Sequence, residues 1–169
     1  NGQSDIFLIS LRRNSIKRLT KDIYDDINPK FIPGTSSIIF SSNRTSDSLK
    51  IEKKVNLEDL KDVYNLFVYS IDTTRNLLYR VTNTLSRNVN PTPTSTTEIY
   101  FISNQQGINN LYKFDIGRKL YTQVTNFRSS IQDYDLGPNK SGISFTMLDN
   151  GITSIYYYPN FNLNQNTFT

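Results

Sequence analysis

The chain has 169 residues, a length that suits one domain, and it contains no cysteine, histidine, tryptophan or alanine. Without histidine and cysteine, this chain by itself cannot form a Ser-His-Asp triad, a Cys-His pair, an imidazole metal site or a disulfide. Its 19 basic and 15 acidic residues give a net charge of +4, but they are interspersed along the sequence, so we expect no nucleic-acid partner.

The composition favours strands and turns over helices. Alanine, the best helix former, is absent, whereas asparagine, serine, threonine, isoleucine, tyrosine and phenylalanine are abundant. No run of residues approaches the ~18 apolar residues that cross a bilayer. We therefore predict an all-β chain without direct membrane insertion.

The chain repeats itself at a fixed spacing. Each copy begins with an Asp or Asn that is followed by apolar residues. Further along, the copy has a threonine, and after a connection a polar residue begins the next apolar-rich part of the chain. The threonine and that polar residue are eight positions apart in all three copies, which chance turns would rarely reproduce. The three pairs are Thr20 and Asn28, Thr82 and Asn90, and Thr125 and Asp133.

An apolar run follows each of these polar positions, after a turn. The runs cover 38–40, 99–102 and 143–145, and a fourth copy opens at Ser154. Each unit thus predicts four short strands separated by turns rich in Pro, Gly, Asn and Ser. Without insertions the period is about 43–45 residues, as in four-stranded propeller blades.

Strands such as 7–9 and 66–69 are apolar on successive residues rather than on alternate ones. Both faces of such a strand must be covered, and adjacent blades of a propeller would cover them. We therefore predict that five residues are buried between sheets: Ile38, Phe40, Tyr100, Phe101 and Phe145.

The segment 24–34 and the following 38–44 resemble the TolB-type β-propeller repeat, a relative of the WD-type repeats. This resemblance implies that the Asn-Pro segment begins the innermost strand of a blade. Residues 28–82 and 90–125 would then form two complete blades, and 1–20 and 133–158 two partial ones. Because propellers typically need about 4–8 blades, we expect residues 1–158 to be part of a larger β-propeller.

Two segments depart from the repeat. The second unit carries an insertion at 45–63, where Asn56 could cap a short helix with Glu58 and Asp59 in its first turn. This insertion is either a solvated loop or a docking element at a blade edge. The segment 159–169 is rich in asparagine and is predicted to be a tail or linker.

The candidate site residues lie at the starts of the inner strands and in the connections before them. The carboxylates of the connection that follows the first repeated threonine could cap turns or contact a partner. Metal binding or catalysis agrees least with their pattern. The Asx residues of the eight-residue spacing could form local turns or line the mouth of a channel. We expect the three connections to lie on one face that binds a protein partner through Asp22, Asp25, Asp26, Asn28, Arg87, Asn88, Asn90, Arg128, Gln132 and Asp133.

The resemblance also implies a location and a role, since TolB-like proteins are periplasmic and work beside outer-membrane lipoproteins. The leading hypothesis is a non-enzymatic interaction scaffold of the bacterial cell envelope that binds another envelope protein and needs no cofactor. A second is the propeller of a prolyl-oligopeptidase-like serine peptidase whose catalytic domain is supplied by residues outside this chain. The 11 tyrosines leave a carbohydrate-binding propeller as a third hypothesis. The sequence makes no prediction of the oligomeric state.

Overall fold

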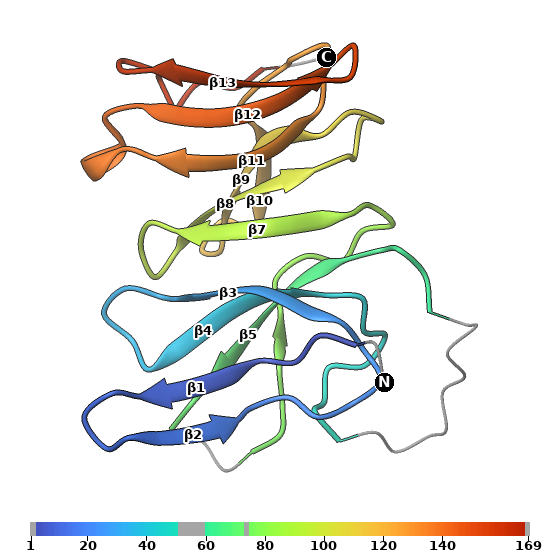
Figure 1. Cartoon of the computed structure of the whole chain (residues 1–169), viewed down its shortest axis with the longest axis vertical. Coiled ribbons are helices and arrows are strands. Elements are labelled where there is room, and N and C mark those ends of the chain that lie inside the picture. The colour runs from blue at the N-terminus through green and yellow to red at the C-terminus, as the bar shows by residue number, and fades with distance from the viewer. Residues whose placement is uncertain (1–2, 51–59, 73–74, 168–169) are drawn as a thin grey trace.

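The computed structural model describes residues 3–50, 60–72 and 75–167, and it consists of antiparallel sheets that follow one another along the long axis of the molecule (Figure 1). The first sheet pairs β1 (Phe7–Ser10) with β2 (Ser15–Arg18). The second contains β3 (Asp26–Phe31), β4 (Ser37–Ser42), β5 (Asn65–Ser70) and β6 (Tyr79–Arg80).

The third sheet contains β7 (Asn88–Pro93), β8 (Glu98–Ser103), β9 (Asn110–Asp115) and β10 (Leu120–Gln123). The fourth contains β11 (Ile131–Leu136), β12 (Ile143–Asp149) and β13 (Ile152–Tyr158), and a 3-10 turn, Pro138–Lys140, joins its first two strands. The prediction of an all-β chain with two complete and two partial blades is confirmed. In the described ranges, no helix has the length and apolar character needed to span a bilayer.

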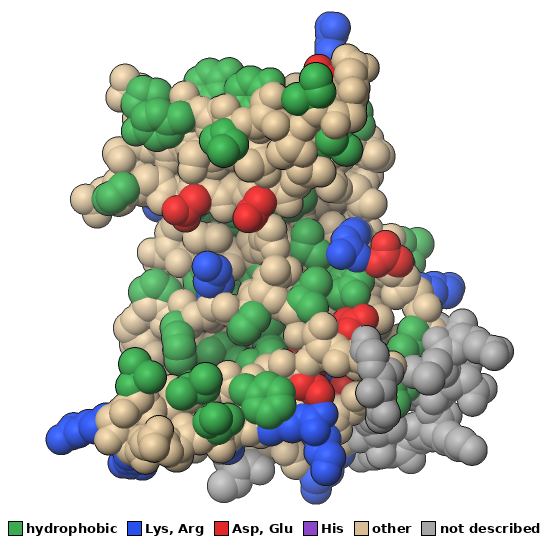
Figure 2. All heavy atoms as spheres, in the orientation of Figure 1, with side chains coloured by type: hydrophobic (Ala, Val, Ile, Leu, Met, Phe, Trp, Pro, Cys, Tyr) green, Lys and Arg blue, Asp and Glu red, His purple; other side chains and the backbone are tan. Residues whose placement is uncertain are grey.

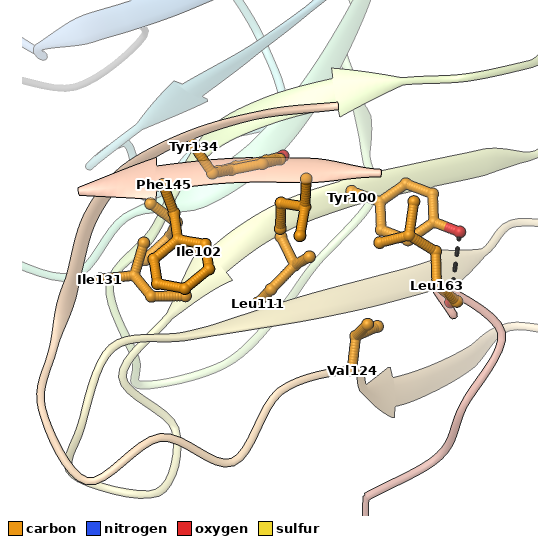
Figure 3. Packing of buried hydrophobic residues seen from close by; sticks show 9 residues of the cluster. Tyr100, Ile102, Leu111, Val124, Ile131, Tyr134, Phe145 and Leu163 are labelled. Atoms are coloured by element: carbon orange, nitrogen blue, oxygen red, sulfur yellow. Dashed lines mark hydrogen bonds between the residues drawn. The ribbon is translucent and has the colours of Figure 1, made fainter. Parts of the chain in front are cut away.

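Apolar side chains fill the space between successive sheets. Figure 3 shows the cluster between the third and fourth sheets, where Tyr100 and Leu111 pack beside Tyr134 and Phe145. A second cluster joins the second and third sheets, and a third joins the first and second. All five residues predicted to be buried between sheets are buried, because each of them belongs to one of these clusters between adjacent sheets.

The repeated threonines have the same role in each blade. Thr20, Thr82 and Thr125 are buried, and each hydroxyl oxygen accepts a hydrogen bond from a strand N–H at 2.8–2.9 Å. Each hydroxyl also donates to the Asp or Asn that opens the copy. The acceptors are Asp5 at 3.4 Å, Asn65 at 2.9 Å and Asn110 at 2.8 Å. This pairing explains why an Asx residue and a threonine recur together.

Replacing Thr82 by valine should lower the free energy of unfolding by about 1–3 kcal/mol. Valine keeps the shape of the side chain but leaves the buried Leu66 N–H without its acceptor. Thr96→Val, in an exposed hairpin turn, is the matched control and should have little effect. Urea denaturation of both variants measures the difference, and equal losses would contradict a special role for the repeated threonine.

Backbone hydrogen bonds tie the start of each inner strand to the preceding blade. Asp26 N–H donates to the carbonyl of Ser4, Asn88 N–H to Tyr64 and Ile131 N–H to Asn109, at 2.9–3.0 Å. A bulge follows in each inner strand. In the second and third sheets its Asn has a positive φ of 53°, which asparagine tolerates better than most residues. The inner strands therefore sit in equivalent positions in successive blades.

The segment 159–167, predicted to be a tail or linker, contacts the third sheet. Residues 159–167 pack on the third sheet: Leu163 is buried, and Thr167 N–H donates to the carbonyl of Gln123 at 3.0 Å. The Tyr100 hydroxyl donates to the carbonyl of Leu163 at 3.5 Å (Figure 3). Leu163 thus supplies an apolar anchor within this polar segment.

The start of the insertion is also packed. Ser48 forms a β-bridge with Leu77, and backbone hydrogen bonds join Asp47 to Leu78 and Leu49 to Asn76 at 2.7–2.8 Å. Residues 45–50 thus lie along the outer edge of the second sheet. The predicted cap, Asn56, lies outside the described residues.

Candidate functional site

The strand order brings the connections named in the sequence analysis to one end of the sheets. Because adjacent strands are antiparallel, the segments 19–25, 81–87 and 124–130 all lie at the end where inner strands begin. Residues 43–44 and 60–64, which follow β4 and precede β5, and the connection 104–109 lie at the same end, which we call the connection end. It is on the right in Figure 1.

Two of the predicted partner-binding residues are buried in the protein instead. The side chains of Asp22 and Asp26 are fully buried and paired with the equally buried Arg44. The guanidinium Nη2 lies 3.1 Å from Asp22 Oδ2 and 2.6–2.7 Å from both oxygens of Asp26. Asp22 and Asp26 therefore have a structural role in the pairing with Arg44, which the sequence did not predict.

This buried ion-pair cluster joins the first connection to the start of the insertion. Arg44 Nη1 donates to the carbonyl of Ser48 at 3.3 Å, and its guanidinium lies 5.3 Å from the ring centre of Tyr24. Burial raises the pKa of the Asp26 carboxyl, and the lowering effect of Arg44 only partly offsets it, with the charge of Asp22 adding to the rise. Two carboxylates thus share one guanidinium in a site closed to solvent.

Asn88 is a third structural residue. It is buried, and its Nδ2 donates to the carbonyl of Tyr64 at 3.1 Å and to the Thr84 hydroxyl at 2.7 Å. These bonds hold the connection 83–87 against the preceding strand. The side-chain amide nitrogen of Asn88, predicted to contact a partner, thus donates within the protein.

The remaining predicted residues of the connection end reach its surface. Asp25 is half-buried and accepts a hydrogen bond from Ser4 N–H at 2.7 Å, whereas Arg128 is exposed. The guanidinium of Arg87 is paired with Asp62 and lies 4.4 Å from the ring centre of Tyr64. Burial raises the pKa of Tyr64, and the nearby Asp25 charge adds to the rise. Charges of both signs are therefore present at this end.

Leu85 is a candidate that the sequence analysis missed. Leu85 is 93% exposed in the connection 83–87, two positions before Arg87, which pairs with Asp62. We use the name connection patch for four solvent-accessible residues of the connection end, namely Asp62, Leu85, Arg87 and Arg128. The sequence signal was a single leucine between Thr84 and Ser86 in an otherwise polar connection.

The other predicted residues lie on the inner strands. Asn90 N–H donates to Asn28 Oδ1 at 3.4 Å, Asn90 Nδ2 donates to Asp133 Oδ1 at 3.0 Å, and the Tyr134 hydroxyl donates to the carbonyl of Asn90 at 2.9 Å. These bonds cross from blade to blade, so the Asx residues do more than form local turns. Burial raises the pKa of the Tyr134 hydroxyl, which keeps it a donor.

The inner strands border a groove of about 510 Å³. Figure 2 shows separate basic and acidic side chains in this part of the molecule, where Lys30, Asp133 and Asp135 line the groove. Gln132 is exposed beside the groove, and its Oε1 accepts a bond from the Thr153 hydroxyl at 3.4 Å. Among the described residues, no group of three or more acidic side chains is placed to hold a metal ion. The lining is formed by Asn28, Pro29, Lys30, Asn90, Thr92, Asp133, Tyr134 and Asp135.

Comparison with known proteins identifies the architecture. No family model and no curated protein matches the sequence. TolB from Acinetobacter baumannii is similar in structure, with a TM-score of 0.65 and 15% identity over 92% of this chain and 35% of TolB. A putative TolB from Agrobacterium tumefaciens gives a TM-score of 0.52 and 13% identity, over 94% of this chain and 71% of that one.

A puromycin-hydrolyzing peptidase from Mycobacterium tuberculosis is similar too, with a TM-score of 0.62 and 14% identity over 85% of this chain and 22% of the peptidase. This chain therefore spans about a fifth of the peptidase and about a third of the A. baumannii TolB. At these identities the similarity concerns the fold. The chain has the fold of consecutive TolB-type β-propeller blades.

Proposed function

We propose that this chain is part of a larger β-propeller that acts as a non-enzymatic scaffold and binds another protein at its connection end. The observation that carries the proposal is the connection patch, in which an exposed leucine lies in the same connection as an arginine that pairs with a carboxylate. Apolar and arginine side chains commonly anchor protein interfaces, and flanking charges select and steer the partner.

The connections that carry the patch are held in place by the protein. Asn65 Oδ1 accepts a bond from Thr84 N–H at 3.0 Å, and Asn110 Oδ1 accepts one from Phe127 N–H at 2.8 Å. Arg87 N–H donates to Asn104 Oδ1 at 2.8 Å. A surface fixed in this way loses little conformational entropy when a partner binds, which favours recognition.

The proposed location is the bacterial periplasm, in association with the outer membrane. Structural similarity to two TolB proteins supports this proposal, and the partner would then be another envelope protein. Two complete and two partial blades fall short of the ~4–8 blades of a closed propeller, which supports a longer protein.

A crosslinking experiment identifies the partner and tests the patch. A photo-crosslinkable residue is introduced at position 85 or, as a control, at position 118, which lies in the β9–β10 turn at the opposite end. In an envelope extract of the source bacterium, a partner of the connection end should be captured from position 85 only. Capture from both positions would indicate non-specific contact.

With that partner in hand, Leu85→Asp should weaken binding at least tenfold, because a buried anchor would be replaced by a charge. Arg128→Glu should mainly slow association, and more so at low salt. Arg118→Glu is the matched control, since Arg118 is equally exposed but lies at the other end, and it should leave both quantities unchanged. Calorimetry measures the affinity, and stopped-flow mixing measures the association rate.

If the patch variants bind normally and deletion of 45–63 abolishes binding, the insertion is the interface.

The alternative function is the propeller of a serine peptidase, and the similarity to the M. tuberculosis peptidase favours it. The blades would then stand beside a hydrolase domain encoded elsewhere in the same gene. A Gly-x-Ser-x-Gly nucleophile elbow in the full-length sequence would support the peptidase. Further propeller repeats with a signal or lipid-attachment sequence would support the scaffold.

A further inference from the structure

The sheets have a second end, opposite the connection end, which we call the turn end. Because adjacent strands are antiparallel, the residues between the outer two strands of successive blades all lie there. They are 11–14 between β1 and β2, 71–72 and 75–78 between β5 and β6, and 116–119 between β9 and β10. The first of these turns is on the left in Figure 1. The other two belong to complete blades, so their place at this end does not depend on further blades before or after this chain.

Each of these three places combines an exposed leucine with exposed basic side chains. Leu11 is 92% exposed, Leu77 63% and Leu120 53%. The exposed basic residues near them are Arg12 and Arg13 in the first blade, Arg75 in the second and Lys119 in the third. We call these leucines and basic residues the turn patch. Arg118 is left out of it because Arg118 pairs with Asp115 of β9 at 3.8 Å.

Acidic side chains are few at the turn end. Glu98, at the start of β8, pairs with Lys140, and Asp135 lines the groove on the inner strands. Asp72 is the exposed carboxylate closest in sequence to the turn patch. The turns that join the inner two strands of the blades contain no acidic residue at all: 32–36, 94–97 and 137–142. Positive charge therefore predominates among the exposed groups of this end.

We propose that the turn patch binds the phosphate headgroups of an anionic membrane surface, so that the turn end faces the lipid without crossing it. Lysine and arginine side chains are attracted to the negative potential of such a surface, and leucines between them enter the boundary between headgroups and acyl chains. A flat surface can contact all three blades together because their turns lie at one end. A nucleic acid would match the basic charges but has no apolar layer for the leucines.

Co-sedimentation of the purified 169-residue chain with lipid vesicles tests the proposal. The chain should bind phosphatidylcholine vesicles that contain phosphatidylglycerol at least tenfold more tightly than vesicles of phosphatidylcholine alone. Lys119→Glu should weaken binding to the anionic vesicles at least fivefold, because an attraction becomes a repulsion. Lys21→Glu is the matched control: it makes the same charge change at an exposed lysine of the connection end, and it should bind like the unmodified chain.

A leucine variant distinguishes a membrane from other sources of phosphate. Leu120→Ser should weaken binding to the anionic vesicles about threefold or more, because serine gains little by entering the acyl boundary. Leu148→Ser is the matched control, since Leu148 is 44% exposed near the end of β12 at the connection end, and it should have no effect. Binding of the unmodified chain should also weaken at high salt, which screens the attraction between exposed charges.

Three outcomes would overturn the proposal. One is equal binding, or no binding, to vesicles with and without phosphatidylglycerol, including the case in which an acidic protein binds the turn end instead. The second is binding that Lys119→Glu and Lys21→Glu weaken equally. The third is binding that Leu120→Ser leaves unchanged, which would indicate a surface for phosphate without lipid. No partner protein takes part in these measurements, so this proposal and the proposed function can fail separately.

Discussion

Replacing Arg44 by alanine is expected to lower the free energy of unfolding by about 3–5 kcal/mol. Arg44 is the only cation that the structure pairs with Asp22 and Asp26, and all three side chains are fully buried. Without the guanidinium, two carboxylates would remain in a site of low polarity, and the Ser48 carbonyl would lose its donor. Urea denaturation with a linear extrapolation measures the loss.

An exposed arginine provides the control for this substitution. Arg118 pairs loosely with Asp115, at 3.8 Å, on the surface, so Arg118→Ala should change stability by no more than about 0.5 kcal/mol. Adding Asp26→Asn to Arg44→Ala should recover part of the stability, because it removes one of the uncompensated charges. Equal effects of Arg44→Ala and Arg118→Ala would contradict the buried ion-pair cluster.

The blades could be predicted from the sequence because each repeated residue acts within its own blade. Thr82 and Asn65 bond to each other across one pair of strands, and Thr125 and Asn110 do the same in the next blade. Such local roles impose a fixed spacing, and the spacing predicted the strand order. The run 66–69 predicted burial on both faces for the same reason, whereas Phe7 and Ile9 of the run 7–9 are exposed, because the first sheet has a neighbouring sheet on only one side.

The roles of the charged residues could not be predicted because their partners are distant in sequence. Asp26 and Arg44 are separated by 18 positions, and neither recurs in the other copies. A cluster of aspartates in a polar connection therefore suggested an exposed acidic surface. Only the packing of Arg44 under the connection shows that two of these aspartates are internal.

The contacts between inner strands also could not be predicted from the sequence. The spacing placed Asn28, Asn90 and Asp133 at equivalent positions, but it could not show that they bond to one another across blades. That contact depends on how closely successive blades stack, which no local pattern encodes. Leu163 is similar, since one leucine in an asparagine-rich segment gave no periodic signal for its buried position.

The second large effect is expected for Phe40→Ala, which should cost about 3–5 kcal/mol. Phe40 is inaccessible to solvent, and its ring stacks on Phe67 with centroids 6.1 Å apart. It belongs to the cluster that also contains Ile6 and Leu78, and so it helps to join the first sheet to the second. Alanine would leave a cavity between two sheets that are tied together by few other strand contacts.

Phe31→Ala is the matched control for this prediction, because Phe31 lies on the neighbouring strand β3 but is 62% exposed. It should cost well under half as much as Phe40→Ala, since little apolar surface returns to water. Urea denaturation of both variants compares the losses. A decrease in the denaturant slope for Phe40→Ala alone would further indicate that the first sheet has already separated from the second in the folded state. If the two substitutions cost the same, Phe40 does not pack in a continuous core between blades, and the first sheet must be held by its connection to the second instead.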